Sequence, residues 1–468
     1  MSPARPFVIL CTLVALLETA TATPLELPEV AAGLSAHPLA TAAASVVERA
    51  EGERLASNGA FDLRTRARAE RVLGYYDRLI LDGELRQPTR WRGLGIYAGW
   101  RLGSGDFADY DLKAATLDRG ELRAGLDLPL LAGGAIDRAR ADQRKATYGL
   151  TIGRAEHTRR MLELERDAAV TYWDWVAAGQ RLAIRERQLE LARRRGRDLE
   201  TTIRQGSTAP IEGVDNARLI AARESSEVTA RRDFARMSLE LSLYLRDGQG
   251  APVSPDRDRV PAMAALPPPV VGEGDLANVI REARARQPAF ATLDARLAAN
   301  RVDLELASNQ LLPSLTASVY VLRGIGPADA RIPDRDRGAA GGALTFEIPL
   351  ERSQARGALA MARADRKRLL AEHQLLTERL AIDARFGVTE LTTARQRVAL
   401  AAEQERIADQ LADAERLRFE RGDSTILIVN LREEAAADAA VARIDAMADY
   451  RKARARYLAT LGHSPVER

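Results

Sequence analysis

The sequence predicts an α+β membrane protein built from two structural repeats, each combining β-strands with a long α-helical hairpin. Three observations support this fold class: an order of motifs that occurs twice about 250 residues apart, short segments of alternating apolar and polar residues, and unusually long helical segments. Among the 468 residues, 46% are hydrophobic but only 5% are aromatic. Such usage is typical of long helices packed through small residues rather than of a globular enzyme core.

The N-terminus is typical of a secretory signal peptide over residues 1–22. Arg5 precedes an apolar run from Phe7 to Leu17, and Ala20-Thr21-Ala22 offers a small-x-small cleavage site. Cys11, the only cysteine, lies in this run, so the mature protein is expected to have no disulfide and no thiolate metal ligand. Lipidation of Cys11 is the alternative interpretation. No later apolar stretch is long enough for a spanning helix, so any membrane contact is expected through β-strands or the protein surface.

The charge balance argues against nucleic acid as a partner. The 69 basic and 66 acidic residues nearly cancel and are interspersed along the chain, whereas binding to phosphates needs a concentrated basic face. We interpret the Arg193-Arg194-Arg195 run as a solvated helix face.

Corresponding motifs open and close the helices of the two halves. His37-Pro38 and Gln287-Pro288 each open a helical stretch, while Gly206 and Gly422 each separate two long helical segments. The segment between the halves contains Pro252, Pro255, Pro261 and a run of three prolines, which no helix accommodates. We therefore expect a first repeat over residues 23–247, a proline-rich linker over 248–274 and a second repeat over 275–468.

Alternating apolar residues indicate four strands, two in each repeat. The expected strands cover about residues 91–102, 121–130, 314–323 and 342–350, and each is about as long as a tilted strand that crosses an outer membrane. A soluble antiparallel sheet with one buried face shows the same alternation. The long polar loops that follow, rich in Gly and Asp, favour the membrane barrel.

Four strands cannot close a barrel, and an open sheet edge is not tolerated in lipid, so several chains are expected to contribute. Three copies give twelve strands and two give eight. Residues 62–90, which include Gly74-Tyr75-Tyr76-Asp77, have no counterpart in the second half. An extra hairpin is one interpretation of this insert, which leaves the strand count open.

Two helical hairpins are expected over residues 137–247 and 354–462. A helix as long as the segment from Asp137 to Gln205 would extend roughly 100 Å, far beyond a globular helix. Ile407, Leu411 and Leu417 belong to a pattern with spacings of three and four, as a coiled-coil-like seam requires. Such hairpins pack lengthwise, and several around one axis make a tube.

With these features together, the sequence resembles the TolC family of outer-membrane efflux proteins over nearly the whole mature chain. The resemblance rests on the order of motifs, which occurs twice and includes Leu311-Leu312-Pro313-Ser314-Leu315 entering a strand and Pro-Leu pairs at strand ends. It implies a homotrimer whose twelve-stranded barrel continues into a periplasmic helical tunnel. It also implies a constriction that opens when docked to a periplasmic adaptor (membrane fusion) protein and an inner-membrane pump.

In this family the turns at the periplasmic tip of the tunnel contact the adaptor, and the resemblance carries this role to the two glycine turns. The alternative is a purely structural role, as a turn between two helices in which glycine is preferred for its left-handed backbone geometry. The residues concerned are Gly206, Ser207, Thr208, Gly422, Asp423 and Ser424.

Some family members close the constriction with aspartates shortly after the tip glycine. The corresponding positions in the second half are Ile428 and Leu431, so an acidic ring is not expected there, while Glu212 occupies the comparable place in the first half. Rings of side chains set the preference of a pore. The candidate gate residues are therefore Glu212, Asn430, Arg432, Ile428 and Leu431, and a solvated helix surface is the alternative for each.

No catalytic constellation is found in the sequence. The four histidines are scattered, and no nucleophile elbow, phosphate-binding loop or dinucleotide fingerprint is present. We therefore expect a passive export channel with no enzymatic activity, no cofactor and no metal, located in the outer membrane with its helical part in the periplasm. The alternative is a soluble periplasmic coiled-coil scaffold or adaptor whose strands form a soluble domain.

Overall fold

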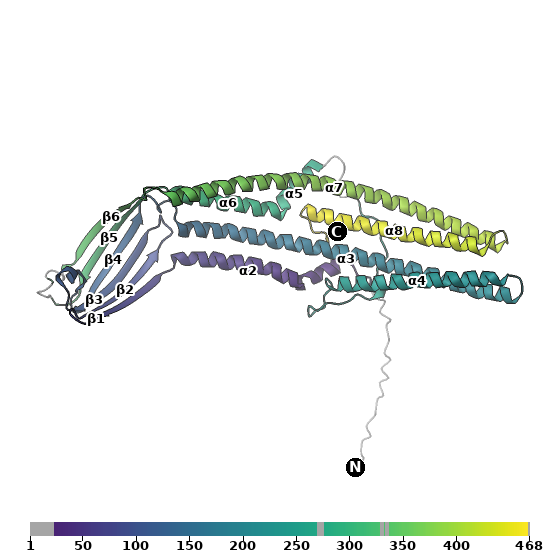
Figure 1. Ribbon diagram of the computed structural model, residues 1–468, viewed down its shortest axis with the longest axis horizontal. Helices are drawn as coiled ribbons and strands as arrows, with labels where there is room; N and C mark the ends of the chain where they lie inside the picture. Colours follow the sequence, from purple (N-terminus) through teal and green to yellow (C-terminus); the bar gives the residue numbers. More distant parts are fainter. Residues whose placement is uncertain (1–22, 269–275, 328–331, 333–336, 467–468) are drawn as a thin grey trace, which may run out of the picture.

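The computed structural model describes residues 23–268, 276–327, 332 and 337–466, and it is strongly elongated (Figure 1). A β-sheet forms one end, and long helices run from it to the opposite end, where two helical turns lie (Figure 1). The expected signal peptide with Cys11 lies outside the described residues, as do parts of the expected linker and of the second strand loop. The predicted fold class, a long helical part joined to a small antiparallel sheet, is confirmed.

The helices of the two halves match one another in order and length. The two longest, one in each half, contain 67 and 68 residues, and each turns into a helix of 33 or 35 residues. The first half contains α1 (Leu27–Gly33), α2 (Pro38–Asn58), α3 (Arg138–Arg204) and α4 (Pro210–Ser242), and the second contains α5 (Leu276–Arg286), α6 (Pro288–Asn309), α7 (Ser353–Glu420) and α8 (Ile426–Thr460).

Local capping explains where several of these helices begin. Proline occupies the first position of α2 and of α6, where its missing N–H costs no hydrogen bond. The His37 imidazole accepts a hydrogen bond from the Leu39 amide at 3.0 Å, and the Asp137 carboxylate accepts one from the Arg140 amide at 2.8 Å. These side chains satisfy amides that have no partner within the helix.

The sheet contains six antiparallel strands rather than the four expected from the sequence. Their order in space is the order in the chain. The first half contributes four strands, because residues 62–90 form a β-hairpin at one edge of the sheet. The strands are β1 (Arg64–Val72), β2 (Arg78–Pro88), β3 (Gly95–Gly105), β4 (Glu121–Pro129), β5 (Ser314–Gly324) and β6 (Ala339–Glu347).

The count of two strands per repeat is therefore wrong for the first half. Apolar alternation identified β3 to β6, but in β1 the side chains that face the same way as Leu81 and Leu85 of β2 are Thr65, Ala67, Ala69 and Arg71, none of them a large apolar one. Small side chains give a weak apolar signal between charged neighbours. Twelve strands no longer follow from three copies, since three times six strands makes eighteen.

The helical part is held together between its halves by α3, which packs against α8. Ala177 of α3 lies in a buried cluster with Ile444 and Ala448 of α8, where small side chains let the helices approach closely. Ion pairs extend this contact along the seam: Arg181 with Asp445 at 3.0 Å, and Lys452 with Asp174 at 2.8 Å.

The proline-rich segment between the halves packs against the surface of the helices. The Gln180 side chain donates to the Pro261 carbonyl at 2.7 Å. A Cβ on Gly179 would lie 2.7 Å from the Val260 methyl groups, so glycine is required for this approach. Among the described residues, no single helix is long and apolar enough to cross a membrane, although the bent pair Leu27–Ala36 and Pro38–Phe61 meets that criterion jointly.

Candidate functional site

The first candidate site is the sheet, whose two faces differ in chemistry. Residues that are direct cross-strand partners lie on the same face, so the strand register assigns each side chain to one of them. The apolar face, as we call it, carries a row that crosses several strands, and its large side chains are exposed in the single chain. It consists mainly of Leu81, Leu85, Ala98, Trp100, Leu122, Ala124, Leu126, Val319, Val321, Leu344 and Phe346.

The opposite face, here called the charged face, is crossed by ion pairs between strands of the first half. Arg86 of β2 bonds Asp127 of β4 at 3.2 Å. Arg123 of β4 contacts Asp82 of β2, and the Ser318 hydroxyl of β5 donates to Asp127 at 2.7 Å. The two ion pairs join β2 to β4 across β3, whereas the Ser318 hydrogen bond joins the neighbouring strands β5 and β4.

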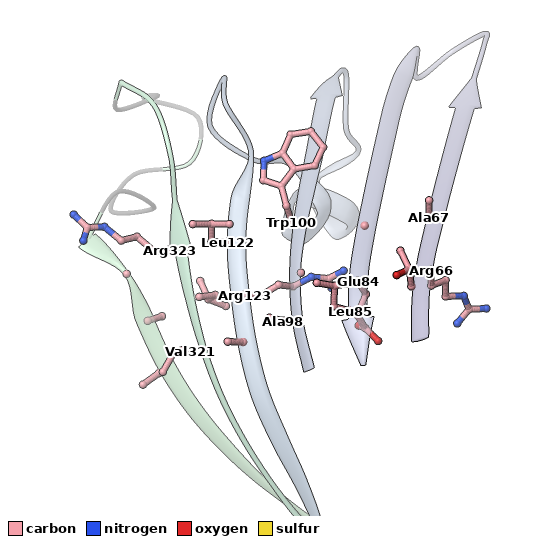
Figure 2. A pocket seen from close by; sticks show the side chains of 18 residues that line it. Arg66, Ala67, Glu84, Leu85, Ala98, Trp100, Leu122, Arg123, Val321 and Arg323 are labelled. Atoms are coloured by element: carbon pink, nitrogen blue, oxygen red, sulfur yellow. The ribbon is translucent and has the colours of Figure 1, made fainter. Parts of the chain in front are cut away.

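A hollow of about 1000 Å³ lies against the sheet and is lined by residues from all six strands (Figure 2). Leu85, Trp100, Leu122 and Val321 belong to its lining and to the apolar face. The helices continue beyond the end of the strands and form no second layer over the sheet (Figure 1). The hollow is therefore part of an uncovered apolar surface and not an enclosed ligand cavity.

The second candidate site is the pair of helical turns at the end farthest from the sheet (Figure 1). Gly206 and Gly422 have φ values of +75° and +84°, a left-handed conformation that glycine adopts without a steric penalty. In both turns the glycine amide bonds a carbonyl three residues back, and the next amide bonds one five residues back. This is a Schellman helix end, present once in each half.

The side chains after each glycine are tied back to the helix that precedes them. The Ser207 hydroxyl donates to the Thr202 carbonyl at 2.9 Å, and the Thr208 hydroxyl donates to the Thr202 hydroxyl at 3.2 Å. Ser424 contacts the Glu415 carboxylate. Asp423 is exposed and its carbonyl accepts from Arg418 at 3.3 Å. The predicted tip residues are thus brought together at one end in two ordered turns.

On the sheet side of the turns, a group of charged and polar residues joins both hairpins. We call it the buried charge cluster, and it consists of Arg195, Arg223, Arg416, Asn430 and Glu433. The Glu433 carboxylate bonds Arg195 at 2.9 Å and Arg416 at 2.8 Å, and lies 3.7 Å from Arg223. Arg195 also donates to the Asn430 side chain at 2.6 Å. The four helices α3, α4, α7 and α8 each supply at least one member.

This buried charge cluster corrects two interpretations of the sequence. Arg195 is not part of a solvated face, because its side chain is only 15% exposed and that of Glu433 only 2%. Asn430 is buried and bonded to Arg195, so it is not a free polar group on a tunnel wall. Sequence reasoning missed Glu433 and Arg416 because nothing in helical spacing shows which charge faces another helix.

The buried charge cluster holds its carboxylate ionised. Burial alone raises the pKa of Glu433, but hydrogen bonds from Arg195 and Arg416 outweigh it, and the pKa lies below the ordinary value. Burial lowers the pKa of Arg223, opposed by the charge of Glu433. One buried, ionised carboxylate is therefore shared by three guanidinium groups at this end of the molecule.

The other candidate gate residues lie on the surface of the first turns of α4 and α8, next to the glycine turns. Ile428, Leu431 and Arg432 are exposed on α8, and Glu212 is partly exposed on α4. Further exposed apolar side chains lie beside them, namely Ile211, Val214 and Leu427. Each hairpin thus presents an apolar strip next to its turn, as spacings of three and four place these residues on one helix side. Within the described residues, no group of three or more His, Cys, Asp and Glu side chains is arranged to hold a metal ion.

Comparison with curated proteins finds one clear relative. The chain is 27% identical over 381 residues to the pyoverdine export outer membrane protein OpmQ of Pseudomonas putida. The aligned region covers 80% of this chain and 77% of that protein. No protein-family model matches the chain.

Solved structures match the fold over almost its whole length. The outer-membrane channel OprN superposes with a TM-score of 0.65 at 16% identity, covering 94% of this chain and 91% of that chain. The open state of the Neisseria gonorrhoeae MtrE outer membrane channel gives a TM-score of 0.64 at 14% identity, covering 94% and 89%. The chain therefore has the fold of the TolC-type outer-membrane channels, the family that its sequence resembles.

Proposed function

We propose that this chain is one protomer of an outer-membrane channel that conducts solutes passively from a periplasmic adaptor and an inner-membrane pump to the exterior. The system served is a tripartite efflux or type I secretion system. The observation that carries the proposal is the two-faced sheet at one end of paired helical hairpins. We assign no chemical reaction to the chain, because the proteins it resembles are channels.

The two faces of the sheet suit a barrel wall between lipid and water. Transmembrane β-barrels turn apolar side chains to the lipid and polar ones to the lumen. The apolar face leaves Val319, Leu344 and Phe346 more than half exposed in the single chain, and lipid would cover them. The charged face would line the pore, where its ion pairs meet water.

Several copies are needed because the sheet of one chain is open at both edges. Backbone amides and carbonyls without partners are too costly in hydrocarbon, so the edges must pair with other copies. A homotrimer is the assembly implied by the resemblance to the TolC family. Around one axis, its helical hairpins would form the wall of a periplasmic tunnel.

At the far end of the tunnel, the two glycine turns are proposed to contact the adaptor. Gly206, Ser207, Gly422 and Asp423 are exposed there, and a Cβ on either glycine would meet open space. Bulky residues at both glycines should impair export while leaving the oligomer intact. Unaltered export would contradict the tip assignment.

The apolar strips next to the turns are proposed to close the pore. Hydrophobic constrictions can gate by excluding water, and Ile428 and Leu431 occupy the positions where an acidic ring is absent. Replacing both with Ser should raise the single-channel conductance in planar bilayers. Replacing Ile211 and Val214 with Ser is the matched change in the first hairpin, and it tells which strip faces the axis. Unchanged conductance in both variants would contradict an apolar gate.

Fractionation tests the channel proposal as a whole. The protein should stay in outer-membrane fractions after an alkaline carbonate wash and should migrate as an oligomer after mild detergent extraction. A periplasmic scaffold would instead be released with the soluble periplasm. Release without detergent would overturn the proposal.

Export by cells tests the transport role separately. Deleting the gene should make cells retain solutes that the associated pump expels, and the intact gene should restore their release. Pyoverdine is the first solute to test, since the relative OpmQ carries it in its name. Normal release of every solute of that pump in the deletion strain would contradict the channel role.

A further inference from the structure

The extra hairpin places β1 at one edge of the sheet and β6 at the other. Each of these strands is hydrogen-bonded on one side only. Both contain nine residues. An edge of this length leaves a row of backbone donors and acceptors that another strand can satisfy.

We propose that β1 of one copy pairs antiparallel with β6 of a second copy, so that the extra hairpin forms the seam between protomers. This inference rests on the proposed assembly of several copies into one barrel. β1 leaves the helical end of the sheet at Arg64, and β6 returns to that end at Glu347 (Figure 1). The strands therefore run in opposite directions, and each has one end at the helical side of the sheet.

On the apolar face, the side chains of the two edges are complementary in size. The β1 edge carries Thr65, Ala67 and Ala69 on this face, and Arg71 follows them at the end away from the helices, paired with Asp77 at 2.7 Å. The β6 edge carries Leu344 and Phe346, which are 72% and 61% exposed in the single chain. Large side chains of one edge would cover small ones of the other, and cross-strand pairs of this kind stabilise a sheet.

On the charged face, β1 carries the large side chains and β6 mostly small ones, and the two edges also carry opposite charges. β6 presents Gly341 and Ala343 there, which leaves room for long arginine side chains of β1. Within the described part of the chain, the side chains of Arg66 and Glu347 take part in no hydrogen bond or ion pair, and the Arg64 side chain donates only to the Ala60 carbonyl at 3.4 Å. A guanidinium of β1 can therefore meet the Glu347 carboxylate of a second copy near the helical end.

Pairing of identical edges is less favourable. Two β1 strands centred on Arg68 would place the Arg68 side chains of both copies opposite one another on the charged face, and like charges opposite one another destabilise a sheet. Such a contact would also leave both β6 edges open. Pairing of β1 with β6 can instead repeat around an axis until the barrel closes. Because each chain contributes an even number of strands, six, every strand in such a barrel stays antiparallel to both neighbours.

The consequence is a wider pore. With three copies the barrel has eighteen strands, and because barrel diameter grows roughly linearly with strand number, it is about one and a half times as wide as a barrel of twelve. Arg64 and Arg66 then line each seam. The barrel would accept bulkier solutes than one built from β3 to β6 alone.

Disulfide cross-linking tests which strand meets β6. The mature chain should have no cysteine, so the full-length double variant Arg64→Cys with Glu347→Cys is oxidised in outer membranes and examined on non-reducing gels. Covalent oligomers are the expected result. The matched control is Tyr97→Cys with Glu347→Cys, because Tyr97 lies on the same face and at the same level as Arg64 through their common partner Arg86.

Each outcome of the cross-linking has a distinct meaning. Oligomers from the Tyr97 pair but not from the Arg64 pair would overturn the inference, because β3 would then be the edge and the extra hairpin would lie outside the barrel. Oligomers from Arg64→Cys alone would indicate β1 paired with β1 and would also overturn it. Resistance of each variant to the carbonate wash shows that it is inserted in the membrane.

Charge reversal provides a second measurement that needs no cross-link. Arg64→Glu and Glu347→Arg should each reduce the detergent-resistant oligomer severalfold, and the double variant should restore it. No loss in either single variant would contradict an ionic contact at the seam. Normal export without the seam cross-link would contradict this inference and leave the channel proposal intact. The seam cross-link without export would support this inference and contradict the channel proposal.

Discussion

The two halves of the chain differ much more in their sheets than in their helices. The long helices contain 67 and 68 residues, yet the first half supplies four strands and the second only two. The two long helices match in length because each runs along two shorter helices of its own half, α3 along α2 and α4, and α7 along α6 and α8. A sheet can gain a hairpin at its edge without disturbing the strands already paired.

The faces of the strands show the same contrast. On the charged face, the first half carries the paired groups Asp82, Arg86, Arg123 and Asp127. The strands of the second half present mainly uncharged residues there, such as Ser318 and Tyr320, with Glu347 at the helical end of β6. The insertion therefore adds charge as well as width, whereas the helical hairpins keep the same plan.

The largest expected effect comes from the buried charge cluster. Glu433→Ala leaves Arg195, Arg223 and Arg416 without their shared carboxylate, and breaking a buried ion pair in this way costs about 3–5 kcal/mol. Faster hydrogen exchange is expected in the peptides of both tips. Glu434→Ala changes the exposed neighbour and should leave exchange near that of the unaltered protein. Equal exchange in the two variants would show that the cluster does not join the hairpins.

Acid should loosen the same end of the molecule. Because the pKa of Glu433 is lowered in the folded protein, its stabilising contribution is fully present above the ordinary glutamate value of 4.5 and is lost as the pH falls through the lowered value. The protection of the tip amides, relative to their intrinsic exchange rate at the same pH, should therefore fall below about pH 4.5. Glu433→Gln should flatten this dependence, and an unchanged pH profile in that variant would assign the effect to another group.

Close approach of α8 to α7 should depend on a glycine in α7. Gly387→Ala places a methyl group against the Tyr457 ring, and overpacking of this kind costs about 1–3 kcal/mol. Gly357→Ala in the same helix meets open space and should be neutral or stabilising by up to about 1 kcal/mol. Thermal unfolding followed by circular dichroism compares the two. Equal midpoints would contradict the packing seen at Gly387.

The tip turns should respond alike in the two halves. Gly206→Ala and Gly422→Ala each force a residue with a Cβ into the left-handed region, at a cost of about 1–2 kcal/mol and without a clash. Adaptor binding by each single variant, measured in detergent, should weaken to a similar degree. A strong loss in one turn only would show that one hairpin makes the contact.

The smallest effect is expected at the exposed ion pairs of the α3–α8 seam. Asp438→Ala removes the partner of Arg185 at 2.8 Å, and exposed pairs contribute about 0–1 kcal/mol. The thermal midpoint should shift little, and still less at high salt. A large shift would mean that this pair belongs to a coupled network rather than to a solvated surface.

The sequence by itself determined the helical plan. Proline at the start of α2 and α6 and glycine after α3 and α7 act through local backbone geometry, so they could be recognised without knowledge of any contact. The alternation in β3 to β6 also sufficed, because the apolar side chains there are large.

Only the tertiary structure decided that β1 and β2 complete the sheet and that Arg195 and Asn430 are buried. The small residues of β1 identify a sheet face only once Leu81 and Leu85 are known to lie beside them. Arg193 and Arg195 are both arginines on one helix, yet only Arg195 faces Glu433, across 238 residues of chain. Local patterns specify conformation, whereas the choice of partner over such separations depends on which surfaces the fold brings together.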